Sequence, residues 1–275
     1  YLKNHSMGEY VFDYPWANAY HQHGLDYYPK LVTAIPFTPS TGDRIRSGFD
    51  LNAEHCDALF SEVMLIADET KASSWHILFP NDLHLNLLYN KDLLQRSAVQ
   101  YHWINTNYES FEHYLLSMTS RKRKMIKKER RHILDQNIHV EILDGTQISH
   151  SMWIFFYQLY ERTYAKRNGT RGYLTSQFFT EIAQTMPEQI AMSVATKNSQ
   201  PIACALYLFD ENTLYGRYWG SIGDYQFLHF ELCYYQGIEF AIKKGLDRYD
   251  AGAQGEQKLV RGFQPVKTYS LHWIK

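Results

Sequence analysis

Apolar positions between residues 138 and 275 switch between a period of about two and a period of about 3.6, which indicates strands alternating with helices. Strands are predicted at 138–143, 190–196, 202–209, 214–220, 248–253 and 268–274, and helices at 148–166, 176–185 and 227–244. Short polar turns join the second, third and fourth strands, so an antiparallel meander is expected there. The predicted order is β-α-α-β-β-β-α-β-loop-β.

The pattern is less regular before residue 109. Apolar residues spaced three and four apart predict an amphipathic helix over 52–71. Short strands are predicted at 9–13, 31–37, 75–79 and 98–104, with a short helix or turn at 14–24. A long helix free of Pro and Gly is predicted over 109–136. We therefore expect two domains, one at 1–108 and a second at 109–275.

Composition narrows the function classes. The chain has 275 residues, 45% of them hydrophobic, and a formal net charge of −1, which argues against a surface built throughout for nucleic acid. Its three cysteines, Cys56, Cys204 and Cys233, lie far apart without metal-ligand or CxxC spacing. Buried thiols in a reducing cytoplasm, and no metal site, are expected. No apolar run approaches the roughly 18–20 residues of a membrane span.

Longer segments resemble a known family. The run SRKRKMIKKERR resembles the basic helix that opens the second GNAT-like domain of the FemABX peptidoglycan aminoacyltransferases. Hallmark segments of the FemAB-like predicted N-acyltransferases resemble ALYLFDENTLYGRYWGS, HFELCYYQGIEFAIKKGL and DAGAQGEQKLVRGFQPVKTYSLHW. The resemblance implies an α/β (α+β) fold, with a GNAT-like mixed sheet flanked by helices. It also implies a tandem arrangement whose first domain is incomplete here.

The activity implied by this resemblance is N-acyl transfer, in the cytoplasm, to a small-molecule or peptide amine. The donor is either acyl-CoA or aminoacyl-tRNA. Many GNAT enzymes bind the CoA pyrophosphate with an Arg/Gln-x-x-Gly-x-Gly/Ala loop at a helix N-terminus. Here residues 221–226 read Ser-Ile-Gly-Asp-Tyr-Gln, so this motif fails and CoA use is in doubt. The alternatives are aminoacyl-tRNA-dependent transfer to a peptidoglycan-type peptide, and a non-catalytic protein that binds glycan or peptide.

Candidate substrate-binding residues come first from the strand at 214–220. Strict alternation places Tyr215, Arg217 and Trp219 on one face. A guanidinium between two aromatic rings is suited to anchor an anion or a carboxylate. Alternatively, Arg217 pairs with a carboxylate in the sheet and the aromatic rings fill the core.

The helix at 227–244 carries Glu231 on its apolar face. Burial raises the pKa of a carboxyl group, which suits a general base. Alternatively, Glu231 is structural and bonds a buried Arg or Tyr, such as Arg217. On a regular helix His229 points about 160° away from Glu231, so the two do not form a simple pair. His229 is a weaker candidate for substrate binding.

The segment 250–263 is the strongest candidate site, because polar groups are dense in a loop that follows a strand. Glu256 is the first candidate base, Glu231 the second, and Asp250 a third catalytic candidate. Gln254, Lys258 and Arg261 are candidate substrate ligands. A solvated turn is the alternative. His272 alternates with Thr268 and Ser270 on the last strand and is expected to face the same cleft.

The run between Arg121 and Arg131 carries eight Lys and Arg residues in eleven positions, with only Met125 and Ile126 apolar. Charges all round a helix are typical of a solvated or inter-domain helix. Alternatively, this basic helix binds tRNA, CoA or an anionic lipid head group. The hypothesis that links these residues is geometric. The face bearing Arg217 and the turn after Asp250 are expected to open onto one crevice.

Overall fold

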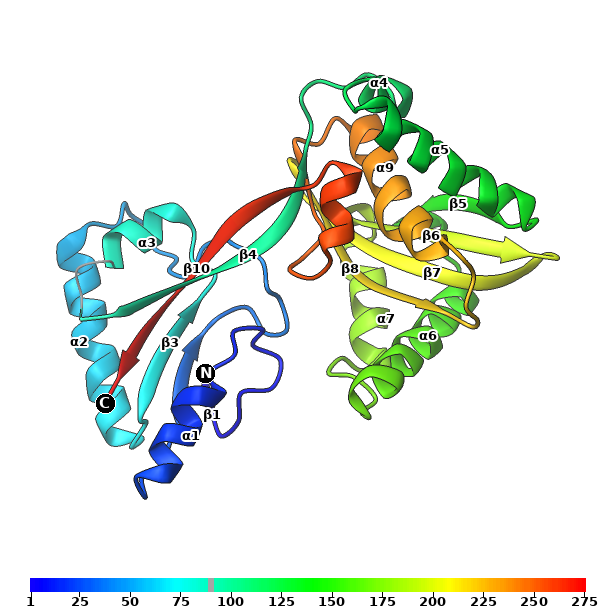
Figure 1. The fold of residues 1–275 in the computed structure, drawn as a ribbon. Coiled ribbons are helices and arrows are strands. Elements are labelled where there is room, and N and C mark those ends of the chain that lie inside the picture. The colour runs from blue at the N-terminus through cyan, green and yellow to red at the C-terminus, as the bar shows by residue number, and fades with distance from the viewer. Residues whose placement is uncertain (89–91) are drawn as a thin grey trace. The chain divides into compact units, whose positions relative to one another are not determined.

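The computed structural model describes residues 1–88 and 92–275, and the chain divides into two compact units (Figure 1). The first unit holds Tyr1–Val99 and Lys267–Lys275, and the second holds Gln100–Val266. The chain passes between the units along two strands, β4 (Leu94–Ile104) and β10 (Gln264–Ile274). This division differs from the boundary expected at 108/109. Residues 100–108 belong with the second unit, and residues 267–275 return to the first.

The first unit is a small mixed sheet in the order β1-β2-β3-β10. Its elements are β1 (Leu2–Lys3), α1 (Tyr14–Gln22), β2 (Lys30–Thr33), α2 (Ala53–Glu69), β3 (Ser74–Leu78) and α3 (Asp82–Leu88). β2 and β3 run parallel, and β10 pairs antiparallel with β3. The apolar stripe of α2 packs on one face of the sheet, around Cys56, Trp75 and Leu271.

Two features of this unit differ from the sequence prediction. The strand predicted at 9–13 is wrong, because residues 9–13 are irregular and Tyr10 has a positive φ. Glu9 and Asp13 turn inward to pair with the buried Lys30, which a strand at that place does not permit. The short helix α3 was not predicted at all. The helix predicted over 52–71 is confirmed, and Asn52 caps it by accepting the His55 amide.

The second unit is a sheet in the order β4-β9-β8-β7-β6-β5 with helices on both faces (Figure 1). Its strands are β5 (His139–Asp144), β6 (Ile190–Lys197), β7 (Gln200–Phe209), β8 (Thr213–Ser221) and β9 (Arg248–Asp250). The predicted meander β6-β7-β8 is antiparallel, and β8 pairs parallel with β9. The predicted class, a mixed sheet flanked by helices, is therefore confirmed.

Two separate cores cover the two faces of this sheet. The first face packs against α4 (Phe111–Leu116), α5 (Ser120–Asp135) and the helical segment formed by α8 (Leu228–Phe230), a π-turn (Glu231–Tyr235) and α9 (Gln236–Lys244). We call this the α9 face. The opposite face packs against α6 (His150–Asn168) and α7 (Ser176–Thr185), and we call it the α6 face (Figure 1).

The single helix predicted over 109–136 is two helices. Ser110 accepts the His113 amide at the start of α4, and Thr119 accepts the Lys122 amide at the start of α5. Two N-caps so close together end the first helix and begin the second without any Pro or Gly. The break turns α5 so that Ile126, Glu129 and Ile133 are buried.

Candidate functional site

The strands β8 and β9 separate at their carboxyl ends. Their parallel register runs from Thr213↔Arg248 to Tyr215↔Asp250, where β9 ends while β8 continues to Ser221. We call the two segments beyond this last pair, residues 216–221 and 251–262, the β8–β9 fork. It brings together the strand and the loop that the sequence singled out. Ligands of open α/β sheets commonly bind where strands end at their carboxyl edge.

A β-bulge lies on β8 within the fork. Leu206 pairs with Tyr218 and Tyr207 pairs with Gly216, so Arg217 is the inserted residue. The insertion reverses the alternation that the sequence predicted. Tyr215 opposes Leu208 on the α6 face, whereas Trp219 belongs to the core of the α9 face. The predicted shared face of Tyr215, Arg217 and Trp219 is therefore wrong. Bulges are frequent beside active sites, because they redirect one side chain.

The α9 side of the fork is aromatic. The ring of Trp219 meets the ring of His229 edge-on at 4.9 Å between centroids, and His229 meets Tyr234 at 5.3 Å. The π-turn supplies Tyr234 and interrupts the regular wheel assumed for this helix. Burial lowers the pKa of His229 to about 4, and the nearby charges of Arg167 and Lys258 act in the same direction. His229 is therefore a neutral imidazole at pH 7.

Lys258 is a buried cation of the fork. It lies in the short 3₁₀ helix η4 (Glu256–Arg261), and only 4% of its surface is exposed. Its Nζ donates to the carbonyl oxygens of Ala251 and Gly252, at 2.5 and 3.0 Å, and lies 5.7 Å from the centre of the Tyr101 ring. Burial lowers the pKa of Lys258 to about 8, against the opposing influence of Asp250. An amine of this kind changes charge close to physiological pH.

Asp250 ends β9 and lies beside a histidine that sequence reasoning missed. Its Oδ1 accepts the Gly252 amide at 2.8 Å and lies 3.5 Å from Nε2 of His102 on β4. The two residues are direct partners across the strands, and both are buried. The sequence offered one signal for His102, its place in the predicted strand 98–104. Only the strand pairing shows that it opposes Asp250.

Two predicted site residues belong to internal ion pairs. Glu231 is buried and accepts from Arg130 at 3.0 Å and from Gln236 at 2.8 Å, so its partner is α5 rather than Arg217. Arg261 is 1% exposed, pairs with Glu129 at 2.7 Å and lies over the Phe230 ring. The predicted roles, a base for Glu231 and a substrate ligand for Arg261, stay predictions. These pairs tie α5 to the helix and loop that border the fork.

The remaining predicted residues are dispersed. Gln254 and Glu256 are exposed on the fork loop. The Tyr215 hydroxyl donates to Asp210 at 2.8 Å. His272 lies in the first unit, fully buried, with its Nδ1 2.6 Å from Nδ1 of His76 and its Nε2 bonded to Ser270. The expectation that His272 faces a cleft is wrong, because its ring is fully buried within the first unit and both of its nitrogens are bonded there.

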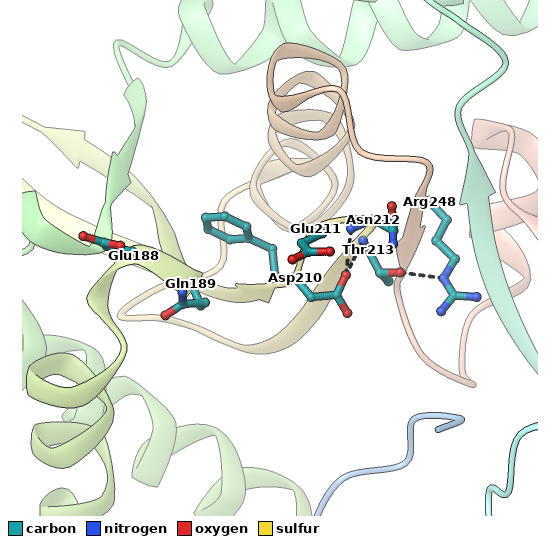
Figure 2. A pocket seen from close by; sticks show the side chains of 8 residues that line it. Glu188, Gln189, Asp210, Glu211, Asn212, Thr213 and Arg248 are labelled. Atoms are coloured by element: carbon teal, nitrogen blue, oxygen red, sulfur yellow. Dashed lines mark hydrogen bonds between the residues drawn. The ribbon is translucent and has the colours of Figure 1, made fainter. Parts of the chain in front are cut away.

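A cavity of about 640 Å³ lies at the opposite end of β8 (Figure 2). It is lined by Glu188, Gln189, Phe209, Asp210, Glu211, Asn212, Thr213 and Arg248, none of them a predicted site residue. Asp210 there accepts the amides of Asn212 and Thr213, which holds the β7–β8 turn (Figure 2). This cavity is wide open and its central carboxylate serves the turn. The chemistry of the fork is a better guide to the site than this hollow.

Within residues 1–88 and 92–275, no cluster of three or more His, Cys, Asp or Glu side chains is arranged to hold a metal ion. Over the same part of the chain, none of the helices has the length and apolar character needed to cross a membrane.

Comparison with known proteins identifies a family. The model of the FemAB-like family, described as peptidoglycan biosynthesis/recognition, matches residues 1–275. No curated protein sequence matches the chain.

Several solved structures share the fold at low sequence identity. The C-terminal domain of a putative lysylphosphatidylglycerol synthetase from Agrobacterium fabrum has a TM-score of 0.57 and 10% identity, with 80% of this chain and 74% of that chain covered. L-PGS from Bacillus licheniformis has a TM-score of 0.56 and 9% identity, with 79% and 72% covered. FemX has a TM-score of 0.52 and 14% identity, with 88% and 83% covered.

Proposed function

This chain belongs to the FemAB-like family, and we propose that it is an N-acyltransferase that moves an acyl or aminoacyl group from an activated donor to an amine. The observation that carries the proposal is the β8–β9 fork with the buried Lys258 at its base. The acceptor class we infer is a peptidoglycan-type peptide with a free amine, which the family description supports.

The fork suits an extended donor. Beyond Tyr215, β8 has no strand partner on its β9 side among the described residues, so no strand covers this edge. The carbonyl oxygen of Trp219 there accepts from Thr163 at 3.2 Å. A linear arm, such as pantetheine or the acceptor end of a tRNA, can hydrogen-bond along such an edge.

Lys258 is placed to stabilise the charge that develops during transfer. When an amine attacks an acyl carbonyl, the carbonyl oxygen becomes negative. A lysine ammonium in a water-poor site stabilises that oxygen more strongly than it would in water. Neutral carbonyl oxygens hold Lys258, and among residues 1–88 and 92–275 no carboxylate lies at ion-pair distance from its Nζ.

The donor is tested by incubating the chain with radiolabelled acetyl-CoA, alanyl-tRNA or seryl-tRNA, and with a stem pentapeptide that carries a free lysine ε-amine. We expect label on the peptide from one donor class only. Binding of the pentapeptide without transfer from either class would support the non-catalytic alternative and overturn the proposal.

A specific surface favours aminoacyl-tRNA as the donor. Arg121, Lys124 and Lys128 are exposed along α5, whose other side is anchored by Glu129 and Ile126. Three exposed cations on one rigid helix suit a phosphate backbone, and neutralising each contact lowers the slope of log affinity against log salt. We expect the triple change to Gln to weaken tRNA binding and flatten that slope. Lys243→Gln, an exposed lysine at the end of α9, is the matched control.

A further inference from the structure

His102 is a buried histidine of the second unit and lies beside the fork. Among the described residues, only its Nε2 is hydrogen-bonded. His102 on β4, Asp250 on β9 and Tyr215 on β8 are successive cross-strand neighbours, so their side chains lie in one row on the α6 face. The Tyr215–Asp250 pair is the last before the fork opens. His102 therefore lies one strand away from the point where β8 and β9 part.

The hydrogen-bond partners fix the form of this ring. Nε2 lies 3.5 Å from Asp250 Oδ1 and 3.4 Å from Gln100 Oε1, both of which only accept. Nε2 therefore carries the proton, and Nδ1 keeps its lone pair. Within the described residues, no donor is bonded to Nδ1. A neutral imidazole whose N–H donates to a carboxylate, and whose other nitrogen keeps a lone pair, has the arrangement of a general base.

His76, His272 and His229 each lack one of these features. In the first unit, both nitrogens of His76 and of His272 are hydrogen-bonded to protein groups. In the fork, the charged groups that act on His229 are all cations, and its pKa of about 4 makes it a weak base. Of these four histidines, His102 alone has both a carboxylate beside one ring nitrogen, Nε2, and no described partner for the other, Nδ1.

We propose that Nδ1 of His102 is the general base of the transfer, with Asp250 as its positioning residue; the inference rests on the proposed function. The acceptor amine attacks the donor carbonyl carbon and forms the new C–N bond. His102 takes the proton released from that nitrogen, and Asp250 stabilises the imidazolium. The bond from carbon to the leaving group then breaks, and His102 returns the proton to the departing thiolate or ribose oxygen.

The charges around His102 are consistent with this cycle. Burial lowers its pKa below the ordinary value, Asp250 on β9 opposes that shift, and Arg248 on β9 and Lys258 on η4 add to it. His102 is therefore unprotonated at pH 7 and ready to accept a proton. It loses that capacity as pH falls through its lowered pKa.

The test compares His102→Gln with His139→Gln, an exposed histidine on β5, in the labelled-donor assay with the lysine pentapeptide. We expect His102→Gln to lower kcat by about 10²–10⁴-fold with KM nearly unchanged, and to remove the acid limb of the kcat–pH profile. Imidazole added to His102→Ala is expected to restore part of the rate. His139→Gln should match the wild type.

The outcomes separate the two proposals. If the wild type transfers label and His102→Gln keeps both its rate and its acid limb, His102 is not the base, and the transferase assignment stands. If His102→Gln is slow but melts well below the wild type, the addition of imidazole to His102→Ala distinguishes the two explanations. Imidazole restores part of the rate if His102 is the base, and it does not if the loss is purely structural. If the wild type transfers label from neither donor class, the proposed function fails and the base assignment fails with it.

Discussion

Each of the two units buries a lysine, but different groups hold the two ammonium ions. Lys30 in the first unit is fully enclosed and pairs with Glu9 at 2.7 Å and with Asp13 at 2.5 Å. Lys258 in the second unit is almost as buried, yet two backbone carbonyls hold it. The charge of a lysine between two carboxylates is compensated within the protein, whereas a lysine on neutral carbonyls keeps an available charge. The first arrangement is structural, and the second suits catalysis.

The largest expected effect tests the structural lysine. Lys30→Met leaves the buried Asp13 without its cation and Glu9 with Lys3 alone, and it should destabilise the first unit by roughly 3–5 kcal/mol. Native-state hydrogen exchange of the β2 and β3 amides measures this loss, with the β7 amides of the second unit as internal reference. Lys3→Met is the matched control, since Lys3 pairs with Glu9 from a more exposed position. Equal protection in Lys30→Met and wild type would show that the Lys30 ion pairs contribute little.

Lys258, which we propose to stabilise the developing oxyanion, should show the reverse profile. Lys258→Met is expected to lower kcat/KM for transfer by about 10²–10³-fold, the usual loss when one donor to a developing oxyanion is removed. Amide protection in the first unit should not change. Lys244→Met, at the exposed end of α9, serves as control. Retention of full transfer by a folded Lys258→Met would leave Lys258 with a structural role alone.

A third substitution tests whether close packing against the backbone stabilises the second unit, as ion pairs stabilise the first. A Cβ on Gly216 would lie 2.6 Å from the Tyr249 hydroxyl, whose ring packs under the start of the fork. Gly216→Ala should therefore destabilise the second unit by about 1–3 kcal/mol, measured by urea unfolding. Gly223→Ala, which meets only the mobile end of Tyr225, should cost much less. Equal costs would indicate that the fork adapts freely.

The last prediction is that the stability of the first unit depends on acid. Burial lowers the pKa of His272 to about 3 and holds the pKa of its partner His76 lower still. Because the unfolded histidines bind protons near pH 6.5 and the folded ones do not, their contribution is complete above pH 6.5. It falls as pH drops below that value, by about 1.4 kcal/mol per pH unit for each histidine. Protection of the β3 amides that stays flat between pH 7 and 5 would contradict this.

The sequence was informative wherever local chemistry decides the structure. Periodicity and turn residues predict the helix at 176–185, the amphipathic helix after Asn52 and the meander. They do not predict the bulge at Arg217, because a period of two carries no sign of an inserted residue. The absence of Pro and Gly predicts one helix over 109–136, whereas caps at Ser110 and Thr119 begin two helices there.

For the candidate site too, the sequence predicts some residues and does not predict their partners. Asp250 and Lys258 stood out as polar residues in a loop after a strand, and the structure places both at the fork. The partners Arg130 for Glu231, Glu129 for Arg261 and His102 for Asp250 come from elements far away in the chain. Contacts of that kind depend on tertiary packing, which no local pattern encodes.

The return of residues 267–275 to the first unit has a consequence for synthesis. β3 pairs along one edge with β10, which the ribosome makes after the whole of the second unit. The unit that is translated first is therefore completed last, and until then one edge of β3 is open to aberrant pairing. The nascent chain can instead fold its uninterrupted middle segment first. A stalled or shortened translation product is expected to need chaperone protection of its beginning rather than of its end.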